Sequence, residues 1–544
     1  MPPEAPAPAT PDPAAAFVLQ RRMLRACRAA AGRLKMADSL GTKLTGRELL
    51  TRILVAKRVL DRVLGPDEKR VGVLLPPTAG GAIVNAALAL SGRVAVNLNY
   101  TSTQPILDIC IERAGLVHVI SSPLFLSRVN LDVGEKLLDA GSLKKLATTA
   151  DKLVGFLQAT VVPLPLLERL LGLHRLRPDD VLTVIFTSGS TGDPKGVVLS
   201  EENVCSNVRA IHQLLHLSPA DVALGVLPFF HSYGYTTTLW TPLVLDPAVI
   251  YHADPRDAQV VGRLAREYHA TILMATPTFL RIYVRRTPAE DFSTLEAVFG
   301  AAEKLPKEVC DAFEQKFGVR PVEAYGATEL APLVAANVPP ARHVPGRPVD
   351  AREGTVGQPI AGCRARITER EGHRELPVGE EGLLWVAGPN VMQGYLDRPD
   401  LTEKVVHDGW YCTGDIARLD REGFITITGR ESRFSKIGGE MVPHLSVEEA
   451  INEALGAADG ELLAVVTAVP DRAKGERLVV FHLPTEREIA GVVAALRAKG
   501  LPNLWVPGTD AFAEIDELPV LGSGKLDLRH LGDMARARFA GAEG

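Results

Sequence analysis

A loop rich in hydroxyl, glycine and lysine residues follows an apolar run within Thr183–Ser200, TVIFTSGSTGDPKGVVLS. Hydroxyl groups and open backbone N–H groups at the end of a strand can surround phosphate oxygens, and glycines let the backbone approach the anion closely. Lys195 adds a positive charge. The pattern therefore predicts a phosphate-binding loop. It is not a Walker A loop, because Gly192 lies three residues before Lys195 instead of directly before it.

Further short motifs, several of which place a charged residue beside glycine or threonine, follow this loop along the chain. They are PFFHSYG (Pro228–Gly234), GAAEKL (Gly300–Leu305), YGATE (Tyr325–Glu329), GWYCTGD (Gly409–Asp415), ITGR (Ile427–Arg430) and LGSGKLD (Leu521–Asp527). In order and spacing, this set together with TSGSTGDPKG resembles the adenylate-forming superfamily of acyl-CoA synthetases, peptide-synthetase adenylation domains and luciferases. The resemblance covers roughly residues 45–530.

A closer resemblance is to the ligase half of the bifunctional 2-acylglycerophosphoethanolamine acyltransferase/acyl-ACP synthetases, and to long-chain acyl-CoA synthetases. It is carried by FHSYGYTTTLWTPL, YGATELAPLVAANVP, GPNVMQGYL (Gly388–Leu396), RFSKIGGEMV and ELPVLGSGKLDL. This resemblance implies an ATP- and Mg²⁺-dependent fatty acid ligase that forms acyl-AMP and pyrophosphate, then transfers the acyl group to acyl carrier protein (ACP). Two alternatives stay open: CoA as the acceptor, or an acyl-AMP ligase that hands the adenylate to a synthase.

The resemblance also implies roles in the first half-reaction. Glu329 would bind magnesium, Asp415 would bind the ribose hydroxyls, and Lys525 would lie beside the α-phosphate only during adenylation. His231, Tyr233 and Gly234 would line the acyl pocket. The expected catalytic residues are Lys525, Glu329, Thr187 and Lys195. The expected ATP- and AMP-binding residues are Thr187, Ser188, Gly189, Ser190, Thr191, Gly192, Lys195, Gly300, Ala301, Ala302, Tyr325, Gly326, Ala327, Thr328, Asp415 and Arg430.

The second half-reaction in this family brings a different segment to the site. The small C-terminal domain rotates, Lys525 leaves, and KIGGE enters to line the thiol channel with Lys436, Gly438, Gly439 and Glu440. The family's hinge is usually Asp or Lys, two residues after the arginine of ITGR. Ser432 stands at that position here, and serine is compatible with a flexible turn.

The elements that position these motifs alternate between short apolar runs and helix-length segments. VGVLLP, VAVNLN, VHVIS, VIFTS, ALGVLP, AVIYH and TILMATP read as strands, which predicts parallel or mixed α/β sheets. From about Gly354, GTVGQPI, CRARITE, GLLWVAG, GWYCTGD, IARLD and FITITG predict a small β-rich subdomain. We expect a disordered tail at 1–16, an AMP-binding domain at 17–430 with the β-rich part at about 350–430, a mobile α+β lid domain at 431–533, and a tail at 534–544.

Composition excludes several classes of protein. The 544 residues carry a net charge of −5, which argues against a nucleic-acid partner. The six cysteines form no C-x-x-C pair, which is typical of a reducing compartment. We therefore expect a cytoplasmic protein. The apolar segment Leu153–Leu173 carries prolines and charges that disfavour a spanning helix; it is expected to pack as a buried helix pair or, alternatively, to rest on the inner face of a membrane.

The sequence also bears on two other functional classes. A non-catalytic adenylate- or lipid-binding homologue would lack Lys525, Glu329 or Lys195, and all three are present. A membrane-integrated acyltransferase is disfavoured, because only about 70 residues precede VGVLLP, the first strand that the apolar pattern predicts. Moreover, the H-x-x-x-x-D matches His174…Asp179 and His216…Asp221 lie inside the ligase region.

Overall fold

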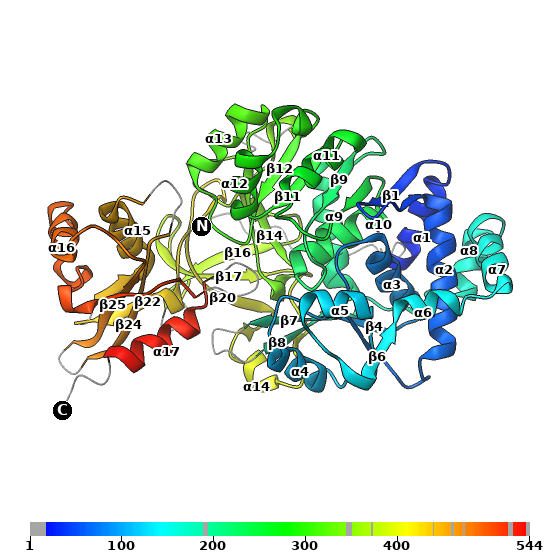
Figure 1. Ribbon diagram of the computed structural model, residues 1–544, viewed down its shortest axis with the longest axis horizontal. Coiled ribbons are helices and arrows are strands. Elements are labelled where there is room, and N and C mark those ends of the chain that lie inside the picture. The colour runs from blue at the N-terminus through cyan, green and yellow to red at the C-terminus, as the bar shows by residue number, and fades with distance from the viewer. Residues whose placement is uncertain are drawn as a thin grey trace, which may run out of the picture.

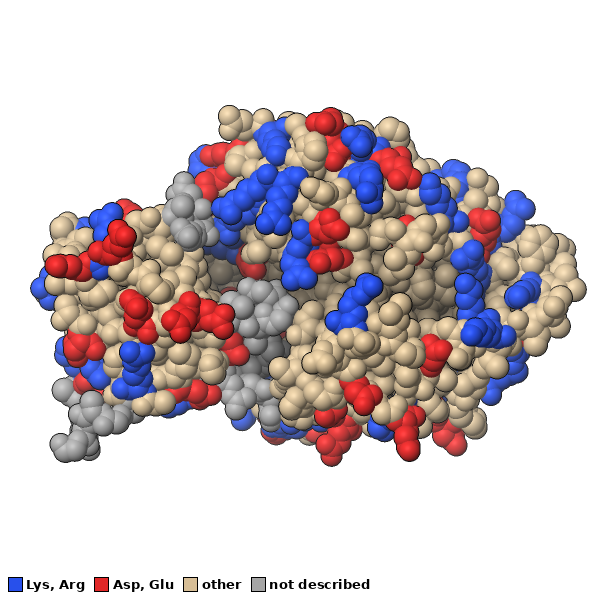
Figure 2. Space-filling view, viewed as in Figure 1, with Lys and Arg blue, Asp and Glu red and all other residues tan. Residues whose placement is uncertain are grey.

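The computed structural model describes residues 18–188, 194–343, 351–370, 374–438, 440–457, 462–471, 474–519 and 526–539. It has a large body built on three sheets and a smaller body that contains the C-terminal helices (Figure 1). On the face shown in Figure 2, side chains of both charge signs are interspersed over the two bodies. Within the described residues, no helix combines the length and apolarity needed to cross a bilayer.

The first sheet carries the phosphate loop at one side. Its strands, in spatial order, are β18 (Gly394–Tyr395), β8 (Pro194–Ser200), β7 (Val181–Ser188), β4 (Val94–Asn97), β3 (Arg70–Val73), β5 (Val119–Ser121) and β6 (Leu137–Asp139). The strands from β7 to β6 are parallel, whereas β8 and β18 are each antiparallel to their neighbours. The expected mixed α/β sheet is therefore present.

The second sheet is mixed in the same way. Its order is β15 (Gln358–Pro359), β14 (Leu333–Ala336), β13 (Val322–Gly326), β12 (Ala297–Gly300), β11 (Ile272–Ala275), β9 (Val222–Gly225), β10 (Ala248–Tyr251), β1 (Leu34–Asp38) and β2 (Lys43–Thr45). The strands from β13 to β1 are parallel, and β2, β14 and β15 pair antiparallel. The ends of β12 and β13 carry two of the expected nucleotide-binding motifs.

The helices of the large body connect and cover these two sheets. They are α1 (Leu19–Ala29), α2 (Gly46–Val63), α3 (Ala79–Leu90), α4 (Gln104–Arg113), α5 (Pro123–Val129), α6 (Ala140–Lys145), α7 (Thr149–Thr160), α8 (Leu164–Leu170), α9 (Glu201–Leu215), α10 (Thr241–Val244), α11 (Ala258–Tyr268), α12 (Pro277–Arg286), α13 (Lys307–Phe317) and α14 (Pro399–Thr402). Local sequence fixes several starts: the Thr78 hydroxyl accepts a hydrogen bond from Gly81 N at α3, as an N-cap does.

The third sheet forms the β-rich part. It contains β16 (Arg364–Thr368), β17 (Glu381–Ala387), β20 (Trp410–Leu419) and β19 (Val406–His407), and β21 (Ile425–Arg430) pairs with β20. The sequence predicted two strands in GWYCTGD and IARLD, and this was wrong, because β20 runs through both. Gly414, with φ of +70°, lies where the pairing register to β17 shifts, so a bulge and not a turn accommodates the glycine.

The small body contains the hairpin β22 (Phe434–Ile437) and β23 (Glu440–Pro443), and a sheet of β24 (Ala464–Asp471), β25 (Gly475–His482) and β26 (Phe512–Glu514). Helices α15 (His444–Leu455), α16 (Ile489–Ala498) and α17 (Leu528–Phe539) accompany them. The tail expected from residue 534 overlaps α17, which continues to Phe539 because Leu531 and Ala535 bury its inner face.

Candidate active site

The hairpin β7–β8 brings the two ends of the phosphate loop together. Thr187 lies directly opposite Lys195, and Ser188 lies opposite Pro194. Residues 189–193, which include Gly189, Ser190, Thr191 and Gly192, lie outside the described residues, as does the side chain of Ser188. The described part of the loop therefore supplies one hydroxyl and one cation at adjacent positions of the sheet.

Lys195 reaches a tyrosine that the sequence analysis did not select. Its Nζ lies 5.3 Å from the centre of the Tyr395 ring, a distance at which the ring's negative face attracts a cation. The Tyr395 hydroxyl donates a hydrogen bond of 2.8 Å to Oε1 of Glu329. Tyr395 thus links the expected phosphate-binding lysine to the expected magnesium-binding carboxylate.

A second tyrosine extends this link. Tyr411, on β20, is buried and interacts with the Tyr395 hydroxyl. Burial, and secondly the Glu329 carboxylate, raise the pKa of both tyrosines above the ordinary value. Both hydroxyls therefore stay protonated at neutral pH, so Tyr395 acts as a hydrogen-bond donor toward Glu329 throughout the physiological range.

Glu329 is positioned by a tight connection after β13. It lies in a short 3₁₀ helix, Thr328–Leu330, and its carbonyl accepts a hydrogen bond of 2.8 Å from Met392 N. Gly326 immediately precedes this connection. A Cβ at Gly326 would lie 2.2 Å from the carbonyl oxygen of Pro332, so only glycine permits this approach of the backbone.

The ribose-binding residues predicted from three separate motifs form one cluster. The Tyr325 hydroxyl donates a hydrogen bond to Oδ2 of Asp415. Arg430, directly opposite Asp415 on the neighbouring strand, places Nε at 3.5 Å from Oδ1. The Asp415 backbone N–H donates to the hydroxyl of Thr413. Both carboxylate oxygens of Asp415 are thus oriented by side chains of the same predicted site.

The expected acyl-side segment adjoins YGATE. The hydroxyls of Ser232 and Thr328 are 3.1 Å apart, and Tyr233 N donates to Nδ1 of His231 at 3.4 Å. A Cβ at Gly234 would lie 2.3 Å from the carbonyl oxygen of Pro228. The segment is therefore folded tightly against the β13 connection, with Tyr233 and Gly234 buried.

A π-helix, Gly234–Trp240, follows this segment, and the sequence analysis did not predict it. Its threonine hydroxyls donate to backbone carbonyls, including that of Ala331, which accepts a 2.7 Å hydrogen bond from Thr236. Such helices are often found at functional sites. The run Thr236–Thr238 does not by itself indicate a π-helix, because threonine hydroxyls also bond to the i−4 carbonyl in ordinary α-helices.

The expected adenine strip lies at the end of β12. Gly300 ends the strand, Ala301 is buried and donates to the Ala275 carbonyl, and Ala302 adopts a positive φ of +72°. The next strand of the sheet, β13, carries Tyr325. The backbone at Gly300–Ala302 and the Tyr325 ring thus belong to neighbouring strands.

The thiol-channel and hinge residues belong to the small body. Gly438 has φ of +58° between β22 and β23, and its N–H donates to the Lys474 carbonyl. Ser432 lies in a short 3₁₀ helix, Glu431–Arg433, and Arg433 forms a buried ion pair with Glu448. Gly439 and Lys525 lie outside the described residues, as do the side chains of Ser432 and Lys436. Their assignments stay predictions.

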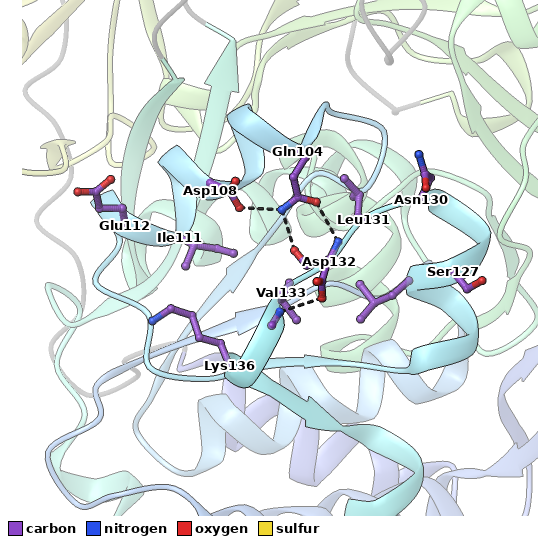
Figure 3. A pocket seen from close by; sticks show the side chains of 12 residues that line it. Gln104, Asp108, Ile111, Glu112, Ser127, Asn130, Leu131, Asp132, Val133 and Lys136 are labelled. Carbon is purple, nitrogen blue, oxygen red and sulfur yellow. Dashed lines mark hydrogen bonds between the residues drawn. The ribbon is translucent and has the colours of Figure 1, made fainter.

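Two surface cavities lie apart from this tyrosine–carboxylate network. One, of about 780 Å³, lies between α4 and the segment 126–136 (Figure 3). Gln104 and Asp132 there bond to each other and to Asp108 and Gly134. The other, of about 1000 Å³, lies between Lys304–Glu308 and α15, and the Lys304–Glu449 ion pair of 2.9 Å joins the two bodies beside it. Thr187, Glu329 and Asp415 line neither cavity.

Glu329 is the residue that could hold a divalent cation. Among the described residues, no group of three or more His, Cys, Asp or Glu side chains could form a metal site alone. A lone oriented carboxylate near a lysine that is expected to bind phosphate instead fits Mg²⁺, which takes few protein ligands and completes its shell with phosphate oxygens and water. Tyr395 holds this carboxylate in place.

Tyr395 and Tyr411 are the site residues that motif reasoning missed. Both stood inside segments already recognised, GPNVMQGYL and GWYCTGD. Tyr395 reaches Glu329 because β18 pairs with β8, Tyr395 opposite Val197, and nothing local in the sequence indicates this pairing. A polar aromatic residue within a matched motif was the only signal available.

Comparisons with known proteins identify the family to which the chain belongs. Residues 24–396 match the family described as AMP-binding enzyme. The chain is 27% identical over 524 residues to a long-chain-fatty-acid–CoA ligase of Yersinia pestis, covering 91% of this chain and 90% of the relative. It is 33% identical over 390 residues to a sulfoacetate–CoA ligase of Cupriavidus necator, covering 71% and 70%.

Solved structures share the fold. ATP-bound MatB from Rhodopseudomonas palustris superposes with a TM-score of 0.77 at 24% identity, over 95% of this chain and 99% of that one. The o-succinylbenzoate CoA synthetase of Bacillus subtilis, in complex with its acyl-adenylate intermediate, gives a TM-score of 0.76 at 22% identity, over 94% and 97%. The expected adenylate-forming enzyme fold is confirmed, and the chain belongs to the AMP-binding enzyme family.

Proposed function

We propose that this protein is an ATP-dependent acid–thiol ligase whose acid is a medium- or long-chain fatty acid. The substrate class is inferred from one observation: the segment on the expected acyl side of the site is uncharged and mostly buried. From Leu227 to Leu245 the chain contains no Asp, Glu, Lys or Arg, and Tyr233 and residues 234–244 are buried. An amino-acid substrate needs a carboxylate there to pair with its ammonium group, and an apolar chain does not.

The first half-reaction joins the fatty acid carboxylate to the α-phosphate of ATP and releases pyrophosphate. Lys195, Thr187 and the loop 188–192 bind the β- and γ-phosphates, and Asp415 with Arg430 binds the ribose. Glu329, oriented by Tyr395, would hold Mg²⁺, which neutralises charge developing on the phosphates. Lys525 supplies a cation near the α-phosphate. This chemistry requires placement of charge and not a general base, so His231 has no proton-transfer role.

The second half-reaction transfers the acyl group to a thiol, and two acceptors are supported by different observations. The names of several relatives, among them long-chain-fatty-acid–CoA ligases of Yersinia pestis and Escherichia coli, favour CoA. The resemblance of FHSYGYTTTLWTPL and RFSKIGGEMV to acyl-ACP synthetases favours the pantetheine thiol of ACP. Both acceptors present the same thiol, so the adenylation site does not discriminate between them.

The test is pyrophosphate release with palmitate, octanoate, sulfoacetate and phenylalanine, each with and without CoA or holo-ACP. We expect the fatty acids to stimulate release, and one thiol acceptor to allow turnover. Glu329→Gln abolishes release, whereas Glu403→Gln, at an exposed acid after α14, leaves it unchanged. Release with sulfoacetate or phenylalanine and none with either fatty acid would overturn the substrate assignment.

A further inference from the structure

Helix α7 exposes its large apolar residues and buries its small ones. Asp151, Gly155 and Ala159 face the protein, whereas Leu153, Phe156 and Leu157 are 58%, 45% and 43% exposed. The exposed residues are spaced three and four apart, so they form one stripe along the helix. A surface helix of a globular protein normally has the opposite arrangement.

Close packing against α2 fixes this orientation. A Cβ at Gly155 would lie 2.8 Å from Cγ2 of Val55 and 3.3 Å from the Thr51 carbonyl oxygen. No larger residue fits the contact, so α7 cannot rotate to bury its leucines. The sequence predicts a buried helix pair for this segment; the helices are present, but their large apolar residues are mostly exposed.

The apolar surface continues beyond α7. Val161, Leu166 and Leu170, in and before α8, are exposed, as is Leu146 before α7. Leu166 and Leu170 are one turn apart and lie on one side of α8. Among the described residues, nearly half of the exposed large apolar side chains lie between 146 and 170. Such a concentration marks an interaction surface.

Arginines from the neighbouring helices hold this surface rigidly. Arg58 and Arg62 of α2 donate to the Asp151 carboxylate at 2.8–2.9 Å. Arg28 of α1 donates to the carbonyls of Gln158 and Val162 at 2.7 Å, which satisfies groups at the end of α7. The leucines are therefore exposed on a helix pair that hydrogen bonds and ion pairs hold in place, and their exposure does not result from loose packing.

The charge around this surface is positive, although the chain as a whole is negative. Residues 140–175 contain five Lys or Arg and two acids, a net charge of +3, against −5 for the chain. Both acids, Asp151 and Glu168, are paired with arginines of α1 or α2. Helices α7 and α8 lie at the end of the molecule opposite the small body, where Figure 2 shows Lys and Arg beside uncharged residues.

We infer that the exposed face of α7 and α8 docks on an anionic lipid bilayer. Apolar side chains enter the interface between headgroups and acyl chains, while lysines and arginines attract anionic headgroups. A second copy of this chain is a less favourable partner for this face, because a dimer through it would bring two positively charged surfaces together. The inference is independent of the proposed function; if the substrate is a fatty acid, docking places the enzyme where that substrate partitions.

The test is flotation of the full-length protein with vesicles of 70% phosphatidylcholine and 30% phosphatidylglycerol, and with pure phosphatidylcholine. We expect flotation with the anionic vesicles at low salt, and weaker flotation at high salt. The variant Leu153→Gln/Phe156→Gln/Leu157→Gln loses at least about tenfold in vesicle partitioning. The matched variant Leu40→Gln/Leu124→Gln/Val378→Gln, altered at exposed apolar residues elsewhere, floats like the wild type.

Thermal melting and pyrophosphate release with octanoate, a soluble substrate, check both triple variants, and we expect neither to change. Wild-type protein that stays unbound with anionic vesicles would overturn the inference. So would equal flotation of the two triple variants. A wild-type dimer that the Leu153/Phe156/Leu157 variant converts to a monomer, without any lipid binding, would assign the surface to a second copy instead.

Discussion

The hydroxyl of Tyr395 lies 2.8 Å from Oε1 of Glu329 and donates a hydrogen bond to it. The face of the same ring lies 5.3 Å from Nζ of Lys195. One side chain thus fixes the distance between the carboxylate proposed to hold magnesium and the lysine proposed to hold phosphates. Tyr395 is a positioning residue, and its hydroxyl and its ring have separable roles.

Tyr395→Phe removes the hydrogen bond to Glu329 and keeps the ring beside Lys195. A hydrogen bond to a charged group is worth about 1.5–3 kcal/mol, so adenylation should slow by roughly 10- to 100-fold. The Mg²⁺ concentration needed for half-maximal rate should rise, which a merely structural role would not cause. The measurement is pyrophosphate release across a Mg²⁺ titration. Tyr268→Phe serves as control, and an unchanged Mg²⁺ dependence in Tyr395→Phe contradicts the positioning role.

Asp415→Asn removes the charge that Tyr325 and Arg430 orient. If this carboxylate binds the ribose, AMP affinity should fall by roughly 10- to 100-fold, the loss typical of a charge-assisted hydrogen bond. Calorimetric titration with AMP measures it without any turnover. Asp408→Asn, at an exposed turn, is the matched control. Equal AMP affinity in Asp415→Asn and wild type would remove Asp415 from the nucleotide site.

Gly326→Ala tests the close approach before Glu329. The added Cβ would lie 2.2 Å from the Pro332 carbonyl oxygen, so the β13–β14 pairing must shift. Overpacking of this kind costs about 1–3 kcal/mol, and the displaced Glu329 should slow adenylation at least about tenfold. Thermal melting and pyrophosphate release are measured together. Gly32→Ala, where a Cβ meets open space, should change neither; normal activity in Gly326→Ala would show that Glu329 needs no such placement.

Glu201 gives a pH-dependent prediction. It is buried and bonds to Gln20, and burial raises its pKa to about 7, against an unfolded value near 4.5. Between these values the folded state holds a proton that the unfolded state has lost, so the free energy of unfolding falls as pH rises toward 7. Glu201→Gln has no such loss. Its stability relative to wild type should therefore increase between pH 5 and pH 8, by up to about 3 kcal/mol.

Urea denaturation at the two pH values measures this difference. Glu112→Gln, at an exposed residue, should show the same difference from wild type at both. A Glu201→Gln difference that is equal at pH 5 and pH 8 would mean that the carboxyl does not titrate between them.

Local patterns were sufficient to predict most of the strands that carry the site. Short apolar runs such as AVIYH and TILMATP became β10 and β11, because buried strands are defined by their own residues. The contact of Tyr395 with Glu329 was not predictable in this way. The two residues are 66 positions apart, and the two-residue strand β18 has no periodicity to recognise.

The orientation of α7 shows a second limit of sequence patterns. The spacing of apolar residues does not indicate which side of a helix faces the protein. The pattern therefore predicts an ordinary buried stripe for Leu153, Phe156 and Leu157. Gly155, through its close contact with α2, and Asp151, through its ion pairs with Arg58 and Arg62 of α2, determine which side is buried. Likewise, the sequence predicts two strands where the structure has one, β20. A β-bulge allows Gly414 to remain inside this continuous strand.

We propose that acyl-adenylate forms at this site and that Lys525 serves only that step. Gly439→Leu should slow thiolysis and leave adenylation nearly unchanged, because the segment KIGGE is proposed to enter the site only for thiolysis. These roles of Lys525 and KIGGE require the small body to rotate about Ser432. The residue after Ser432, Arg433, is held in the small body by its buried ion pair with Glu448. Rates of the two half-reactions, measured separately, distinguish the steps.

The most direct measurement is a rapid-quench single turnover with α-labelled ATP, palmitate and no thiol, followed by thiolysis of synthetic palmitoyl-adenylate. We expect wild-type protein to transfer labelled AMP to the fatty acid. In Lys525→Ala this transfer slows by about 10²–10³, the loss typical of one preorganised contact in the transition state, while thiolysis keeps its rate. Absence of labelled acyl-adenylate in the wild type, or equal slowing of both steps in Lys525→Ala, would contradict the proposed division of the two half-reactions.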